Sequence, residues 1–280
     1  MDKRPLGVFD SGLGGLSAVK AILKYLPQED IVYFGDTGRV PYGTRSEKTI
    51  ELYAKEDIAF LEKFNCKLIM AACGTVSSVA KNAVASVKEP FVEVVSPACA
   101  AAVKATKNKR IGVMGTSATI NSGSYVKKIK QLDPEIEVVG VSCPMLVSLV
   151  ENNWIDSNDI IAIEMVKRYV KPLTDKKVDT IILGCTHFPH LSPVIKKVVG
   201  ESVTLIDTGY EAVMRAKAVL QENGLLNEPG HKGESSYYIS DRTQNFSETA
   251  KTLLGEDISD KANFIDINKF EKELTSKGYE

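Results

Sequence analysis

Short β-branched runs alternate with longer amphipathic stretches along most of the chain, and this pattern restricts the fold more than any other feature. Stretches such as LSAVKAILKYL and TIELYAKEDIAFLEKF carry apolar residues at helical spacing. Repeated strand–helix–strand units predict an α/β fold with mainly parallel sheets, in which ligands bind at the carboxyl ends of strands. The predicted strands are residues 6–9, 30–34, 67–71, 91–95, 110–114, 136–141, 179–183, 203–206 and 236–239.

The composition is that of a globular enzyme with one large domain or two moderate ones: 280 residues, 44% hydrophobic and 25% charged. A net charge of −1 gives no electrostatic signature for nucleic acid or an anionic membrane. No apolar run reaches the roughly 18 residues of a membrane span, and no signal-peptide pattern is present. We therefore expect a cytoplasmic protein whose five widely spaced cysteines are free thiols.

A weak internal repeat indicates two related halves. PLGVFDSGLGGLS at 5–17 resembles RIGVMGTSATINSG at 110–123, at an offset of 105 residues between the shared Gly-Val pairs. Two strand-end cysteines, Cys73 in LIMAACGTVSS and Cys185 in TIILGCTHFPH, are 112 residues apart. The similar offsets suggest two α/β units, each with a Ser/Thr loop and a cysteine at strand ends.

The predicted domains are residues 1–97 together with 208–280, and residues 98–207. No flexible linker separates them, so we expect the segment 95–102 to carry the chain across. The tail at 235–280 alternates strand and helix patterns and is predicted to pack on the first half.

The glycine-rich loop FDSGLGGLS has several possible functions. Gly12 and Gly14 follow a strand and Asp36 ends the next one, as in a dinucleotide fingerprint, but a serine occupies the third glycine position. The Asp10 carboxylate would also repel a pyrophosphate, and no GK[ST] follows for a phosphate loop. The remaining possibilities are a loop whose backbone amides approach a ligand, or simple helix capping by Asp10 and Ser11.

A second loop, GDTGRVPYGTRS at 35–46, follows the next strand directly. Asp36, Arg39 and Tyr42 place polar groups where a binding site is expected. The loop is therefore a candidate wall of the cleft, although the same residues would suit an ordinary surface connection.

The two cysteine loops allow several interpretations. Cys185, His187 and His190 suggest a metal site, but C-x-H-x-x-H lacks the usual zinc spacings, so no metal is expected. A single hydrolase nucleophile would leave Cys73 unexplained, and redox pairs are usually CxxC. Two inert buried thiols are also possible.

Two thiols on opposite walls of a cleft suit one reaction particularly well. An amino acid is inverted at its α-carbon when one group removes the proton from one face and another returns a proton to the opposite face. A thiol is suitable because a helix amino terminus or a positive neighbour can bring its pKa towards the working pH.

Five motifs together resemble glutamate racemase, within the cofactor-independent aspartate/glutamate racemases. They are GVFDSGLGGLS, GDTGRVPYGTRS, ACGTVSS, GVMGTSATINSGSY and GCTHFPHL, in that order between residues 5 and 215. The resemblance implies two pseudo-symmetric α/β domains with the active site between them, often in a homodimer. It also implies an enzyme that needs neither pyridoxal phosphate nor metal and makes D-glutamate for peptidoglycan.

The resemblance assigns roles residue by residue. Cys73 and Cys185 match the bases on the two faces. Asp10 would assist Cys73, while His187, with Glu151 nearby, would assist Cys185. Other matching positions would hold the substrate through hydroxyls and backbone amides. The substrate-binding positions are Asp10, Ser11, Tyr42, Gly43, Gly74, Thr75, Thr119, Thr186 and His187.

One position departs from the family pattern. The usual Cys-Asn-Thr is Cys73-Gly74-Thr75 here, so a hydrogen-bonding amide is missing and only the Gly74 backbone N–H remains. If this weakens substrate binding, Gly74→Asn should lower KM by the equivalent of roughly 0.5 to 1.5 kcal/mol.

Two alternatives to glutamate racemisation remain. Aspartate racemases tend to carry Glu after the second Cys-Thr, whereas this chain has His187 followed by Phe188 and Pro189, which resembles the glutamate branch. From a different class, a non-catalytic amino-acid-binding protein or a thiol redox protein would use the same strand-end loops.

Overall fold

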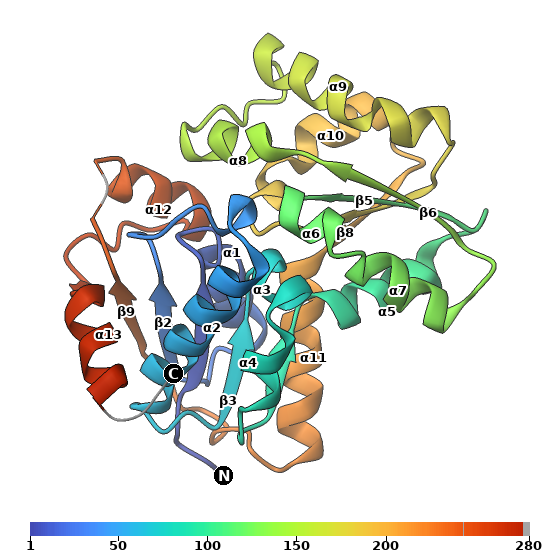
Figure 1. Ribbon diagram of the computed structural model, residues 1–280. Coiled ribbons are helices and arrows are strands. Elements are labelled where there is room, and N and C mark those ends of the chain that lie inside the picture. The colour runs from blue at the N-terminus through green and yellow to red at the C-terminus, as the bar shows by residue number, and fades with distance from the viewer. Residues whose placement is uncertain (243, 277–280) are drawn as a thin grey trace.

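The computed structural model describes residues 1–242 and 244–276 and contains two parallel sheets (Figure 1). The larger sheet has six strands in the order β10-β9-β2-β1-β3-β4, and the smaller has four in the order β6-β5-β7-β8. The strands of the larger sheet are β1 (Leu6–Asp10), β2 (Ile31–Gly35), β3 (Leu68–Ala71), β4 (Phe91–Glu93), β9 (Ser235–Ile239) and β10 (Ala262–Phe264). Those of the smaller sheet are β5 (Arg110–Gly115), β6 (Glu137–Ser142), β7 (Thr180–Leu183) and β8 (Thr204–Asp207).

Helices connect the strands, as the 3.6-residue spacing of apolar side chains predicts. Several begin at side-chain caps; for example, Ser46 accepts a hydrogen bond from the Thr49 amide at the start of α2. The helices of the first half are α1 (Leu16–Tyr25), η1 (Tyr42–Thr44), α2 (Glu47–Glu62), α3 (Gly74–Val79), α4 (Lys81–Ala85) and α5 (Val95–Ala105). Those that follow are α6 (Ser117–Asn121), α7 (Ser124–Leu132), α8 (Pro144–Glu151), α9 (Ile160–Asp175), η2 (Phe188–Leu191), α10 (Ser192–Val199), α11 (Thr208–Glu222), α12 (Phe246–Leu254) and α13 (Ile267–Ser276).

The two sheets have the same strand order in their four equivalent strands. In each, the first strand of the unit is central, the second pairs on one side, and the third and fourth follow on the other, so β2-β1-β3-β4 corresponds to β6-β5-β7-β8. The central strand β1 is buried along its whole length, which accounts for its continuous apolar run, whereas the edge strand β6 is not. The common winding confirms that the internal repeat reflects two related units.

The nine predicted strands are present, with ends shifted by at most two residues. The predicted crossover segment is the first part of α5, which leads from β4 of the larger sheet to β5 of the smaller. Helix α11 follows β8 on the way back to β9, and α5 and α11 lie side by side where the chain crosses (Figure 1). Strand β9 pairs with β2, so the described part of the tail joins the first half as predicted.

The apolar core is shared between the two units. One cluster of buried side chains includes Leu6 and Val8 from β1 as well as Ile181 and Leu183 from β7. None of the helices in the described ranges is long and apolar enough to cross a membrane.

Candidate active site

The candidate site residues come from the carboxyl ends of equivalent strands. Asp10 is the last residue of β1 and Cys73 immediately precedes α3, just after β3. In the second unit, Thr116 follows β5 and Cys185 follows β7. Parallel strands bring such residues to one edge of each sheet, which is where α/β proteins bind ligands.

The two edges touch through glycines that leave no room for a side chain. A Cβ atom on Gly74 would lie 2.2 Å from the carbonyl oxygen of Gly184, the residue before Cys185. A Cβ on Gly14 would lie 2.1 Å from the Thr186 hydroxyl oxygen. The loops that carry the two cysteines therefore meet directly, across the boundary between the two sheets.

Cys73 lies in an acidic and hydroxyl-rich environment. Its side chain is buried, and its thiol donates to the Ser11 hydroxyl oxygen, with Sγ 3.5 Å from that oxygen. Burial, and secondly the Asp10 carboxylate, raise the pKa of the Cys73 thiol to about 12. This thiol is protonated at rest, so it is a proton donor until a base removes its proton.

Asp10 has one carboxylate oxygen held by backbone amides and one that accepts no hydrogen bond from the described residues. Its Oδ2 accepts hydrogen bonds from the amides of Gly12 (3.2 Å) and Gly15 (3.0 Å). Its Oδ1 is buried and has no hydrogen-bond partner within residues 1–242 and 244–276. Burial raises the pKa of Asp10, while His187 and the loop amides act in the opposite direction. The glycine loop thus orients a buried carboxyl group with one oxygen available for proton transfer.

Cys185 has a histidine partner instead. Its Sγ lies 3.7 Å from His187 Nδ1, and His187 Nε2 lies 3.2 Å from Glu151 Oε1 at the end of α8. The second contact is an ion pair without the directionality of a hydrogen bond. Burial alone would lower the pKa of His187, but Cys185 and Glu151 outweigh it and raise that pKa to about 10. The resulting imidazolium is suited to stabilise a thiolate at Cys185.

Hydroxyl groups of the two units contact each other beside the cysteines. The oxygens of Thr75 and Thr116 are 3.0 Å apart, and the Thr116 hydroxyl is 3.0 Å from that of Thr119. These groups and Thr186 are buried or nearly so, and they supply donors and acceptors for a polar ligand. Ser17 donates to the Thr186 carbonyl oxygen at 3.2 Å and ties the glycine loop to the second unit.

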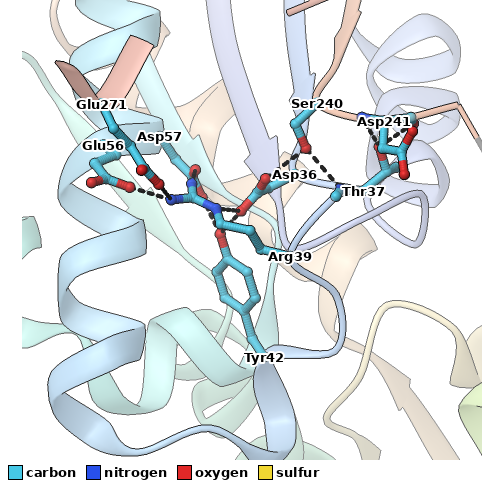
Figure 2. A network of polar contacts seen from close by, with 10 residues as sticks. Asp36, Thr37, Arg39, Tyr42, Glu56, Asp57, Ser240, Asp241 and Glu271 are labelled. Carbon is cyan, nitrogen blue, oxygen red and sulfur yellow. Dashed lines mark hydrogen bonds and ion pairs between the residues drawn. The ribbon is translucent and has the colours of Figure 1, made fainter. Parts of the chain in front are cut away.

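The interpretation of Asp36, Arg39 and Tyr42 as side chains of the cleft wall is wrong. The Tyr42 hydroxyl donates to Asp36 and lies 3.2 Å from Asp57, and Arg39 is paired with carboxylates of the same cluster (Figure 2). These side chains fill the interior of the first unit. The Gly43 backbone reaches the second unit, where a Cβ on Gly43 would lie 2.6 Å from Thr116.

The packing around Gly74 argues against the expectation that Gly74→Asn would improve substrate binding. The clash of a Cβ at this position is with the backbone of Gly184, which cannot rotate away as a side chain would. An asparagine could fit only if the two cysteine loops moved apart. The glycine is therefore matched to the close approach of these loops.

The other thiols and His190 lie outside this arrangement. All five cysteines are free, so Cys73 and Cys185 are not bonded to each other. Burial lowers the pKa of His190 to about 4, with His187 and Lys20 adding to the effect. Within the described residues there is no group of three or more His, Cys, Asp or Glu that could hold a metal ion.

Three contributors were not singled out from the sequence. Thr116, Ser17 and the contact of Gly14 with Thr186 all depend on how the two units face each other. Thr116 alone had a local signal, since a threonine after a strand and before a helical stretch is a typical N-cap.

The two sheets have the same order in their four equivalent strands, and each carries one buried thiol after its third strand, Cys73 and Cys185. The family model for Asp/Glu/Hydantoin racemases matches residues 9–216, and the chain belongs to this family. It is 40% identical to a glutamate racemase of Geobacter metallireducens over 93% of this chain and 96% of the relative.

Solved structures show the same fold. Glutamate racemase isoform RacE1 from Bacillus anthracis has a TM-score of 0.90 and 35% identity, covering 95% of this chain and 99% of its own. The glutamate racemase from Francisella tularensis, solved in complex with D-glutamate, has a TM-score of 0.89 and 34% identity, covering 96% of this chain and 100% of its own.

Proposed function

We propose that this chain interconverts L-glutamate and D-glutamate. The observation that carries the proposal is the pair of buried thiols at equivalent ends of β3 and β7, on loops in contact, each with its own ionisable partner. Glutamate racemases among its relatives, at about 40% identity over nearly the whole length, support the choice of substrate. The D-glutamate formed would serve peptidoglycan synthesis.

The raised pKa of Cys73 suits conversion of the L-substrate. Cys185, as a thiolate beside the His187 imidazolium, takes the α-proton from one face. Cys73, whose raised pKa keeps it protonated, then gives its proton to the opposite face. Asp10 and His187, with Glu151 behind it, restore the starting protonation by moving protons to and from the two sulfur atoms.

Conversion of the D-substrate runs through the same groups in the reverse order. Here Asp10 receives the proton of Cys73 on its free Oδ1, and the thiolate so formed is the base. All proton transfers in this scheme use groups of the chain itself, so it requires neither pyridoxal phosphate nor a metal ion.

The substrate's carboxylates need hydrogen-bond donors, and its amino group needs a hydrogen-bonding partner. We assign these contacts to hydroxyls and backbone amides that line the meeting edges of the two units. The residues assigned are Ser11, Gly43, Gly74, Thr75, Thr119 and Thr186.

The division of the chain follows from its sheets. We place one domain at residues 1–97 with 208–280 and the other at 98–207, since these limits separate the strands of the two sheets.

We also propose a homodimer, supported by exposed large apolar side chains between residues 145 and 161, among them Met145, Trp154 and Ile160. Light scattering of the purified protein tests this assembly.

The direct test follows the circular dichroism of L-glutamate or D-glutamate incubated with purified protein that has been dialysed against a chelator. Decay of either signal to zero is the expected result, with incorporation of solvent deuterium at the α-carbon. Activity on aspartate but not glutamate would assign the chain to the other branch. Loss of activity on dialysis, restored by zinc or pyridoxal phosphate, would contradict the scheme.

A further inference from the structure

A largely buried cluster of carboxyl groups surrounds one arginine, Arg39, in the first unit (Figure 2). Arg39 pairs with Asp36 at 2.6 Å, with Asp57 at 3.3 Å, with Glu271 at 3.0 Å, and also with Glu56. These acids come from the loop after β2, from helix α2 and from helix α13 near the end of the chain. One guanidinium group therefore joins three separate segments.

Four carboxyl groups meet the single Arg39 guanidinium, and such an excess of acid does not by itself add stability. The side chains of Asp36 and Asp57 are fully buried, and burial together with the Asp36 charge raises the pKa of Asp57. Removing such groups from water is costly, and well-packed apolar residues would often be at least as stable. What the directed contacts of a guanidinium provide in return is a defined geometry.

The tail contributes a second set of contacts to the same loop. Ser240, next to the end of β9, donates to Asp36 Oδ1 at 2.6 Å and accepts from the Gly38 amide at 2.8 Å. Thr37 donates to the Asp241 carbonyl oxygen, and the Asp241 amide donates back at 2.8 Å. The loop after β2 is thus held by the tail at both Ser240–Asp241 and Glu271.

The loop leads directly from this cluster to the meeting edge of the two units. Tyr42 donates to Asp36 inside the cluster, and the next residue, Gly43, packs against Thr116. Thr116 is in turn 3.0 Å from Thr75, two residues after Cys73. A shift of Tyr42 would therefore move the Gly43 backbone relative to Thr116.

We propose that Arg39 is a positioning residue for substrate binding: with Asp36 and Glu271 it holds the loop at 36–44 so that the Gly43 backbone meets the substrate. This gives the C-terminal segment a role in the site through Ser240 and Glu271. The inference rests on the proposed function, because Gly43 is assigned there as a substrate contact.

The test compares Arg39→Lys and Glu271→Gln with the wild-type chain. Lysine keeps the charge but cannot reach several acids in fixed directions, and Glu271→Gln removes the charge that pairs Arg39 with α13. We expect Arg39→Lys to raise KM for glutamate about ten-fold, and Glu271→Gln by a smaller factor, as for loss of about one net hydrogen bond to the substrate. The kcat should change by less than about two-fold, since a contact made equally in ground and transition states affects KM alone.

The matched control is the double variant Lys67→Met/Glu29→Gln. It removes another fully buried ion pair of the same sheet, 2.5 Å long, at the amino ends of the strands and away from the site. It should lower the unfolding midpoint and leave KM unchanged.

Three outcomes would overturn the inference: an unchanged KM in folded Arg39→Lys, a kcat loss without a KM change, or an equal KM rise in the control. If Arg39→Lys does not fold, Glu271→Gln decides by the same measurements. Absence of glutamate racemisation by the wild-type chain would instead overturn the proposed function. Calorimetric titration with D-glutamate provides a reading of affinity that is independent of turnover.

Discussion

The two cysteines hold equivalent places in two sheets of one winding, yet their neighbours differ. Cys73 has the Ser11 hydroxyl beside it and the Asp10 carboxylate near it, whereas Cys185 has His187 backed by Glu151. A carboxylate near a thiol favours the protonated sulfur, and an imidazolium favours the thiolate. The fold therefore repeats the position of the thiol, while local residues give each copy a different ionisable partner.

Replacing either cysteine should cause the largest loss of racemisation. Cys73→Ser and Cys185→Ser should each reduce racemisation by at least about 10³-fold, because a hydroxyl is a far weaker base near neutral pH than a thiolate. With a β-substituted glutamate that can eliminate after deprotonation, the remaining thiol should act on one enantiomer only. We expect Cys73→Ser to process the L-analogue and Cys185→Ser the D-analogue.

Chiral chromatography of the unreacted analogue measures this preference. Turnover of the same enantiomer by both variants, or near wild-type racemisation by one, would show that the two thiols do not act from opposite faces.

Replacing the ionisable partner of each thiol should produce the same preference for one enantiomer, with a smaller loss of activity. Asp10→Asn and His187→Gln should each lower kcat by about 10²-fold, a typical contribution of one proton-transfer group. In elimination assays, Asp10→Asn should mainly slow the D-analogue and His187→Gln the L-analogue. Equal losses on both enantiomers would mean that the partners serve the site as a whole.

Position 74 tests how closely the two halves must approach. Gly74→Ala should lower kcat/KM about ten-fold and Gly74→Asn further, because even a Cβ would meet the Gly184 carbonyl oxygen at 2.2 Å. Gly140→Ala is the control, since its Cβ would meet a side chain and no backbone, with Ile120 Cγ2 at 3.2 Å. Steady-state kinetics of the three variants decide; wild-type activity of Gly74→Asn would show that the loops separate at no cost.

His187 and Cys73 should each lower the free energy of unfolding as the pH rises, His187 at lower pH and Cys73 at higher pH. His187 has a folded pKa of about 10 against an ordinary 6.5, so the folded chain keeps a proton that the unfolded chain releases between these values. Its contribution is complete below pH 6.5 and is lost as the pH rises towards 10. The Cys73 thiol, with a pKa of about 12 against 9, acts likewise at higher pH.

Urea unfolding between pH 6 and 11 measures the slopes, each at most about 1.4 kcal/mol per pH unit for one proton. His187→Gln should flatten only the lower window and Cys73→Ser only the upper one. A slope unchanged in His187→Gln would show that His187 is not protonated in the folded chain.

Features carried by local patterns were predictable from the sequence. The strands, the repeat and the strand-end positions of Cys73 and Cys185 follow from apolar periodicity and the rules of parallel sheets. The direction of the Tyr42 side chain was not, because its partner Asp57 is on another element and Arg39 is completed by Glu271, which is 232 residues away. Nor was the packing of Gly74, since it depends on the distance between two units that no local pattern records.

The strands of the first unit come from two separate segments of the chain, with the smaller sheet between them. This order affects how the chain folds during synthesis. Ser240 and Asp36 form a hydrogen bond across 204 residues, and β2 has no partner on its outer edge until β9 is made. At 5–20 residues per second, this delay is about 10 to 40 s. The four strands of the smaller sheet leave the ribosome within that interval, and we expect proteolysis of stalled nascent chains to find residues 98–207 protected before residues 1–97. The site would then become competent only when the last fifth of the chain has emerged, so that incomplete chains neither bind nor consume substrate.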